Sequence, residues 1–203
     1  MKEINSNFIQ PSMKELLSFA TSVKNVDRDP TLRTNRLLLR KLELSDSDLI
    51  FKFQSKKENF KYVDMPVYKS LKEAPNYIHR MNKGVENNKW IIWAIADVST
   101  NKILGTITIW NISMNQSKAE VGYVLFPEYV GKGIMSEALN KVIEYGFNDM
   151  KLKSIEAFTS SLNSKSIALL EKNKFYKISS FSEETSNGES VEMDIYILKS
   201  TDE

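Results

Sequence analysis

Residues 119–139 read AEVGYVLFPEYVGKGIMSEAL. The alternating pattern before Pro127 predicts a strand, and Gly131 and Gly133 form a short turn after it. Apolar side chains at helical spacing then predict a helix, namely Ile134, Ala138, Leu139, Val142, Ile143 and Phe147. Glycines leave the amides of such a turn uncovered, and a helix N-terminus carries partial positive charge. The pattern fits a pyrophosphate site, and on spacing alone it fits a plain tight turn equally well.

Two other phosphate-binding motifs do not match this turn. A Walker loop would need Ser or Thr after Lys132, where the chain has Gly133. A dinucleotide-binding G-x-G-x-x-G motif would need a glycine at Ser136. The strand before the turn also belongs to an antiparallel run. The sequence therefore argues against both nucleotide-binding loops.

The rest of the chain alternates between strand and helix patterns. Strands are predicted near residues 36–42, 90–96, 103–110, 118–126 and 154–159, with a terminal hairpin around Asn187 and Gly188. Helices are predicted after residue 45, over 70–86, after Gly133 and over 163–172. This order predicts an α/β fold, an α+β sandwich around one mixed, mostly antiparallel sheet of about seven strands flanked by helices.

Residues 1–30 differ from the rest of the chain. Met13, Leu16, Leu17, Ala20 and Val23 stand at helical spacing, and Pro30 ends the segment. We expect an amphipathic helical extension at 1–30, packed on its own domain or on a partner, and one domain over residues 31–203.

Composition excludes several classes of site. The chain has 203 residues, 41% of them hydrophobic, and a formal net charge of +2, so neither nucleic acid nor a membrane is expected as a partner. It has no cysteine and one histidine, His79, which excludes disulfides, cysteine nucleophiles, thiolate metal sites and sites that need two imidazoles. No metal is expected. Without a long apolar block or a secretory signal, a cytoplasmic protein is expected.

The segment GYVLFPEYVGKGIMSEAL resembles the acyl-CoA-binding motif of the GNAT superfamily of N-acetyltransferases, most closely its RimJ/RimL-like branch. Upstream, IADVSTNKILGTITIW resembles that branch's substrate-side hairpin, with its glycine at Gly105. Downstream, Asn163 to Ser166 followed by LLEKNKFYK resembles its N-x-x-S helix and the turn after it. The resemblance covers roughly residues 32–199 in matching order.

The resemblance implies acetyl-CoA as the acyl donor. It assigns the pyrophosphate to the amides of Gly131, Lys132, Gly133, Ile134, Met135 and Ser136. The pantetheine would run beside the strand that ends at Leu125 and Phe126, and Asn163 and Ser166 would contact the cofactor near its thiol.

Four features depart from the family pattern. Val130 replaces the usual Gln or Arg, Met135 replaces a small residue, and Lys174 stands where the family usually has Gly before Phe175. The helix after residue 163 also has no tyrosine near Leu169, where many relatives keep one as the acid for the departing thiolate.

Transfer to an amine needs the amine in its neutral form, so a base must accept a proton. We predict Glu120 as that base, because strand alternation places it on one face with Gly122 and Val124. An exposed surface role for Glu120 is an equal alternative. Glu183, Glu184 and Glu189 of the terminal hairpin are competing carboxylates.

Ser166 is predicted to protonate or hydrogen-bond the leaving thiolate, or else only to support the helix cap with Asn163. The implied acceptor is a primary amine. A protein N-terminal α-amine follows from the branch, and a small amine such as an amino acid, polyamine or aminoglycoside is the alternative. A non-catalytic acyl-CoA-binding module is a further alternative, and a homodimer is compatible with the resemblance without an interface being indicated.

Overall fold

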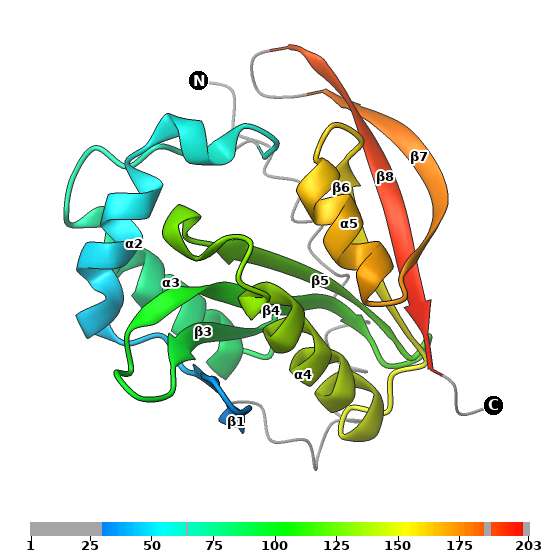
Figure 1. Cartoon of the computed structure of the whole chain (residues 1–203), viewed down its shortest axis with the longest axis horizontal. Helices are drawn as coiled ribbons and strands as arrows, with labels where there is room; N and C mark the ends of the chain where they lie inside the picture. Colours follow the sequence, from blue (N-terminus) through cyan, green and yellow to red (C-terminus); the bar gives the residue numbers. More distant parts are fainter. Residues whose placement is uncertain (1–29, 64, 185–187, 201–203) are drawn as a thin grey trace.

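The structure, a computed structural model, describes residues 30–63, 65–184 and 188–200. These residues form one eight-stranded sheet in the order β1-β2-β3-β4-β5-β6-β8-β7 (Figure 1). Its strands are β1 (Leu32–Arg33), β2 (Leu37–Arg40), β3 (Ile91–Asp97), β4 (Ile103–Ser113), β5 (Lys118–Leu125), β6 (Ser154–Ser160), β7 (Tyr176–Glu184) and β8 (Ser190–Lys199). Neighbouring strands are antiparallel except β5 and β6, which are parallel.

The helices lie between these strands in the chain. They are α2 (Ser47–Gln54), α3 (Glu73–Glu86), α4 (Ile134–Asn148) and α5 (Ser164–Lys172), with three short 3-10 turns, η1 (Leu44–Asp46), η2 (Lys57–Phe60) and η3 (Pro127–Tyr129). The predicted class, a mostly antiparallel sheet flanked by helices, is confirmed. The strand beyond the predicted seven is β1, whose two residues are too few to show a periodic pattern.

Two predicted features lie partly outside the described residues. The helical extension predicted for 1–30 is described only at Pro30, whose carbonyl oxygen accepts a 2.7 Å hydrogen bond from Trp93 Nε1. Of the predicted turn, Asn187 lies outside the described residues, and Gly188 has a φ of 81°. The strands β7 and β8 on either side pair as an antiparallel hairpin.

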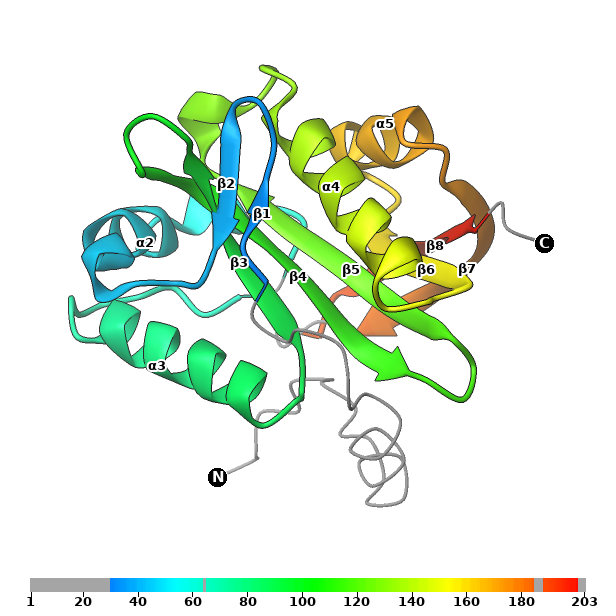
Figure 2. The ribbon, with the colours of Figure 1, turned by 90° about the horizontal axis from the view of Figure 1, so that it is seen from below.

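Each face of the sheet has its own helices and its own core (Figure 2). The α4/α5 face buries residues that include Leu37, Trp93, Ile107, Val121, Leu139, Val142, Ile155 and Leu170. The α2/α3 face buries residues that include Ile50, Phe53, Ile78, Ile92, Ala94 and Phe126. The alternation of strand side chains between two helix layers explains why β3 is apolar at almost every position.

The parallel strands β5 and β6 pair over only three positions, from Lys118 opposite Ser154 to Glu120 opposite Glu156. Beyond that point β5 stays paired with β4, and β6 stays paired with β8. Residues 121–125 of β5 and 157–160 of β6 therefore diverge, and we call the space between them the wedge (Figure 1). Backbone groups of β5 that point into the wedge have no β6 partner there.

The end of α5 explains one departure from the family pattern. The amide of Lys174 donates to the carbonyl of Glu171, and that of Phe175 donates to Leu170, each at 3.0 Å. This is a Schellman motif, which needs a left-handed residue at the position of Lys174. Lys174 has a φ of 69°, so a lysine adopts a conformation that favours glycine.

Replacing Lys174 with glycine is expected to stabilise the protein by about 0.5–1 kcal/mol, because the left-handed strain exceeds the added chain entropy of glycine. Urea unfolding monitored by circular dichroism measures this change. The matched control is Lys172→Gly at the last helical position, which is expected to lower stability by roughly 0.5 kcal/mol. Destabilisation by both glycines would contradict this explanation of the turn.

Candidate active site

The turn before α4 exposes its backbone. Gly131 and Gly133 have φ angles of 81° and 73°, in the left-handed region that favours glycine. A Cβ built on Gly131 would meet nothing within 4 Å. Gly133 is the N-cap of α4 and offers no side chain to the first helical amides, whose N–H groups have no partner inside the helix. The turn therefore combines bare donors, open space and the positive end of a helix, which fits a diphosphate.

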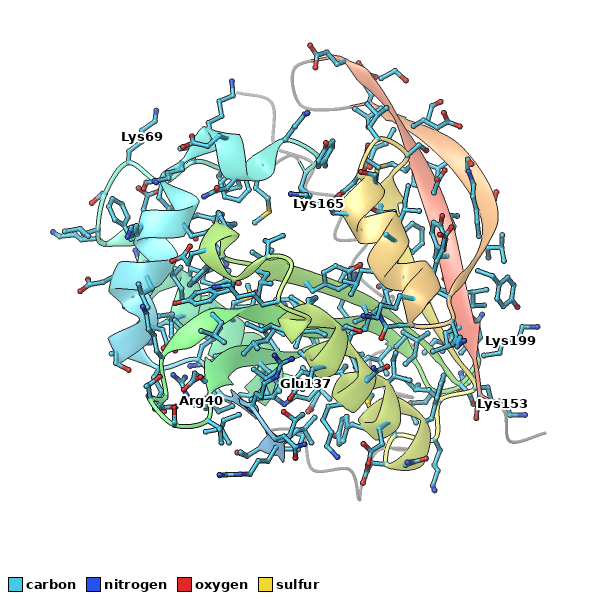
Figure 3. All side chains as sticks on the ribbon, in the orientation of Figure 1. Arg40, Lys69, Glu137, Lys153, Lys165 and Lys199 are labelled. Atoms are coloured by element: carbon cyan, nitrogen blue, oxygen red, sulfur yellow. The ribbon has the colours of Figure 1, made fainter. Side chains whose placement is uncertain are left out.

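A polar clamp holds this turn against the first strands. Glu137, in the first turn of α4, accepts hydrogen bonds from Thr34 Oγ1 at 2.5 Å and from Arg36 Nε at 2.6 Å. Arg36 Nη1 also donates to the carbonyl oxygen of Lys132 at 3.1 Å. Figure 3 labels Glu137 at the start of α4. Burial acts to raise the pKa of Glu137, but the hydrogen bonds from Thr34 and Arg36 outweigh it, and the pKa lies below its usual value. The Glu137 carboxylate therefore stays charged at neutral pH.

The first turn of α5 reaches β5 across the wedge. Asn163 caps α5, and its Oδ1 accepts a 3.2 Å hydrogen bond from the amide of Ser166. The hydroxyl of Ser166 lies 2.9 Å from the hydroxyl of Tyr123 on β5. Asn163 and Ser166, the two predicted residues, thus lie together beside the wedge. One of their roles is to cap α5.

Glu120 lies at the closed end of the wedge, on the α2/α3 face. Burial raises its pKa, and the charge of Glu156, its neighbour on β6, acts in the same direction, while a hydrogen bond from Asn111 opposes both. Asn111 Nδ2 donates to Glu120 Oε1 at 2.8 Å. Lys118 Nζ lies 3.6 Å from Glu156 Oε1 and partly offsets the negative charge of Glu156. Glu120 is therefore a partly buried carboxylate with a raised pKa, a state suited to a general base.

The three competing carboxylates have more open surroundings. Glu184 and Glu189 are exposed, and Glu183 is half-buried on the edge strand β7. Position at the wedge distinguishes Glu120 from all three, and burial distinguishes it from Glu184 and Glu189.

Comparison with known proteins agrees with this geometry. The family profile described as "Acetyltransferase (GNAT) domain" matches residues 36–176. The chain belongs to the GNAT acetyltransferase family. A curated relative, the uncharacterized N-acetyltransferase p20 of Bacillus licheniformis, is 35% identical over 147 residues, which cover 72% of this chain and 83% of p20. The protein is therefore an N-acetyltransferase that uses acetyl-CoA as its acetyl donor.

Two solved GNAT structures show the same fold. The ribosomal-protein-S5-alanine acetyltransferase from Vibrio fischeri has a TM-score of 0.74 at 22% identity, covering 86% of this chain and 98% of that chain. The spermidine N-acetyltransferase from Vibrio cholerae, in complex with CoA and spermine, has a TM-score of 0.70 at 23% identity, covering 82% of this chain and 96% of that one. Identities this low show the fold alone.

At the cofactor positions predicted for this GNAT domain, some side chains are buried in the core while the backbone amides of the turn stay accessible. Ile134 and Met135 bury their side chains in the α4/α5 core, so Met135 leaves the amides of the turn uncovered. Ser136 Oγ donates to Asn173 Oδ1 at 3.1 Å and ties α4 to the end of α5. The Lys132 ammonium lies 5.5 Å from the centre of the Tyr129 ring. Val130 is exposed, so its side chain does not fill the turn.

The two strand residues differ from each other. Leu125 is half-buried at the end of β5 beside the wedge. The Phe126 ring is buried and stacks on Phe53 at 5.1 Å, its amide donates to Leu104, and its carbonyl accepts from Tyr129. Phe126 is therefore a core residue of the α2/α3 face, and Leu125 is the better placed of the two for cofactor contact.

Three residues at the site, Arg36, Glu137 and Tyr123, were not predicted from the sequence, whereas Ser166 was. Arg36 and Glu137 are 101 residues apart in the chain, and Tyr123 and Ser166 are 43 apart. The alternation of β5 did place Tyr123 opposite to Glu120, but only the position of α5 brings its hydroxyl to Ser166. Among the described residues, no group of three or more metal-ligating side chains is present, and no helix is long and apolar enough to cross a bilayer.

Gly131→Val is expected to weaken CoA binding by about tenfold or more, because a branched side chain strains the left-handed backbone and covers the amides. Isothermal titration calorimetry with CoA measures this loss. Gly188→Val is the matched control, since Gly188 has the same φ of 81° in the distant β7–β8 hairpin. Equal CoA affinity in the two variants would contradict the assignment of the turn.

Proposed function

We propose that this enzyme acetylates a primary amine by direct attack on acetyl-CoA in a ternary complex, as a RimJ/RimL-like enzyme with a protein N-terminal α-amine as acceptor. The observation that carries the proposal is the wedge. It joins a bare-amide turn at its open end to the partly buried Glu120 at its closed end. The acetyl donor and the proposed base, Glu120, would thus share one opening in the sheet.

The cofactor would follow this opening. Amides of residues 131–136 would hold the pyrophosphate, and the pantetheine would run beside β5 near Leu125, where the backbone has no β6 partner. Its thiol end would meet Asn163 and Ser166 at the start of α5. Holding the two reactants together in this way would supply most of the rate enhancement.

Glu120 would accept the proton that the attacking amine loses. The carboxylate lies on the α2/α3 face, opposite the face that carries α4 and α5. Donor and acceptor could therefore approach the thioester from opposite sides of the sheet. Trp110 lies against Gly122 on the same face, where a Cβ would come within 2.3 Å of its ring, and so forms a wall beside Glu120.

The shape of the acceptor side favours a protein over a small amine. On the α2/α3 face beyond the wedge, Phe158 is 36% exposed, Phe181 40% and Tyr176 48%. An open apolar surface suits a peptide chain that leads its N-terminus to Glu120, whereas a small amine would need an enclosing pocket. The acceptor, a cytoplasmic location and a homodimer stay predictions.

The direct test follows CoA release from acetyl-CoA with a thiol reagent. The chain has no cysteine, so every thiol detected comes from CoA. We expect release to depend on N-terminal peptides and to be slower with spermidine, amino acids or aminoglycosides. Faster release with a small amine would reassign the acceptor class, and tight CoA binding without release for any amine would identify a non-catalytic module.

Glu120→Gln is expected to lower kcat by about 100-fold at neutral pH with little change in CoA affinity. Because the pKa of Glu120 is raised, the wild-type rate should fall as pH drops through that value, in addition to the fall caused by amine protonation. At acid pH, log kcat/KM should fall with a slope of about two in the wild type and about one in the variant.

The matched control is Glu156→Gln. Removing the neighbouring charge lowers the pKa of Glu120, so the acid limb should move to lower pH while activity at neutral pH persists. An unchanged pH profile in Glu120→Gln would exclude Glu120 as the base.

A further inference from the structure

Tyr123 and Ser166 form a hydroxyl pair across the wedge. Their oxygens lie 2.9 Å apart, and either can be the donor. Tyr123 comes from β5, with its ring against the α4/α5 core, and Ser166 comes from the first turn of α5. The pair thus connects β5, one side of the wedge, to the first turn of α5, next to the predicted thiol end.

One of the two hydroxyl hydrogens of the pair is not used in the hydrogen bond between Tyr123 and Ser166. Two hydroxyls carry two protons, and their mutual hydrogen bond uses one of them. The amide of Ser166 is already bonded to Asn163 Oδ1. A phenol is a better donor than an aliphatic hydroxyl, so Tyr123 donating to Ser166 is the favoured direction. Ser166 then keeps its own hydrogen for a third group.

We propose that Tyr123 is a positioning residue for thiolate departure: it donates to Ser166 and thereby directs the Ser166 hydroxyl hydrogen at the sulfur of CoA. This inference rests on the proposed function. In this chain α5 has no tyrosine near Leu169. The proposal gives a tyrosine of β5, Tyr123, an indirect role in thiolate departure instead.

Neither hydroxyl of the Tyr123–Ser166 pair loses its proton during acetyl transfer. The amine nitrogen bonds to the acetyl carbon, its proton goes to Glu120, and the carbon–sulfur bond breaks with its electron pair on sulfur. The resulting thiolate accepts a hydrogen bond from Ser166 and takes up a proton from solvent after release. A hydrogen bond to a charged acceptor is stronger than one to a neutral acceptor, so it favours the departing state.

The surroundings of Tyr123 keep it a donor. Burial raises its pKa to about 12, against a smaller opposing effect of the hydrogen bond with Ser166. The phenol therefore stays protonated across the pH range in which an amine can attack. It can orient the serine at every working pH, and its loss should change the rate without adding a pH limb.

The test measures the thiol pKa of CoA bound to the enzyme, from the pH dependence of its alkylation by iodoacetamide. The chain has no cysteine, so only CoA reacts. In the wild type we expect the pKa of the bound thiol to lie about one unit below that of the thiol of free CoA, measured by the same reaction. Tyr123→Phe and Ser166→Ala should each return it toward that value, and the double variant should add nothing to Ser166→Ala. In Tyr123→Phe, kcat should fall severalfold or more, with KM for acetyl-CoA unchanged.

Tyr145→Phe is the matched control, because Tyr145 is a buried tyrosine of the same core, on α4. It should leave the thiol pKa unchanged, whatever its effect on stability. An unchanged thiol pKa in Tyr123→Phe would overturn the proposal while leaving the proposed function intact. If Tyr123→Phe does not fold, an unchanged thiol pKa in Ser166→Ala overturns it equally. Failure of the wild type to bind CoA would instead contradict the proposed function itself.

Discussion

The parallel pairing of β5 and β6 stops after three residues, and the opening between the two strands depends on that. Parallel neighbours need a crossover connection, which here is α4. The crossover leaves from the carboxyl end of β5, so the glycine turn that precedes α4 lies at the open end of the wedge. Ligands of α/β sheets bind at such carboxyl ends, where a diverging strand leaves backbone donors unpaired. The proposed diphosphate and thioester sites therefore belong to one opening.

The wedge stays open because each of its sides is held from elsewhere. β5 is paired with β4 as far as Leu125, and β6 is paired with β8 along its length. The clamp of Arg36, Thr34 and Glu137 fixes the turn, and Ser136 with Asn173 joins α4 to α5. Tyr123 and Ser166 then connect β5 to α5 across the opening. Beyond Glu120, side-chain contacts take the place of pairing between β5 and β6, which leaves the backbone of β5 free on that side for the proposed cofactor.

Local patterns predicted most of the fold and the glycine turn before α4. The binding of the cofactor by that turn follows from the family resemblance and stays a prediction. Periodicity is a property of consecutive residues, so the strands, the helices and the face on which Glu120 lies could be read from the sequence. The contacts of Arg36 with Glu137 and of Tyr123 with Ser166 join residues 101 and 43 positions apart. Their geometry depends on how α4 and α5 pack, which no local pattern encodes. Phe126 shows the same limit: the family resemblance placed it beside the pantetheine, and only the structure shows that its ring packs on Phe53 in the core.

The most direct measurement is a crystal structure of the enzyme with CoA bound. It should show the diphosphate within hydrogen-bond distance of the amides of residues 131–136, with the pantetheine between residues 121–125 of β5 and 157–160 of β6. CoA bound elsewhere, or β5 and β6 paired along their full length, would contradict the role given to the wedge.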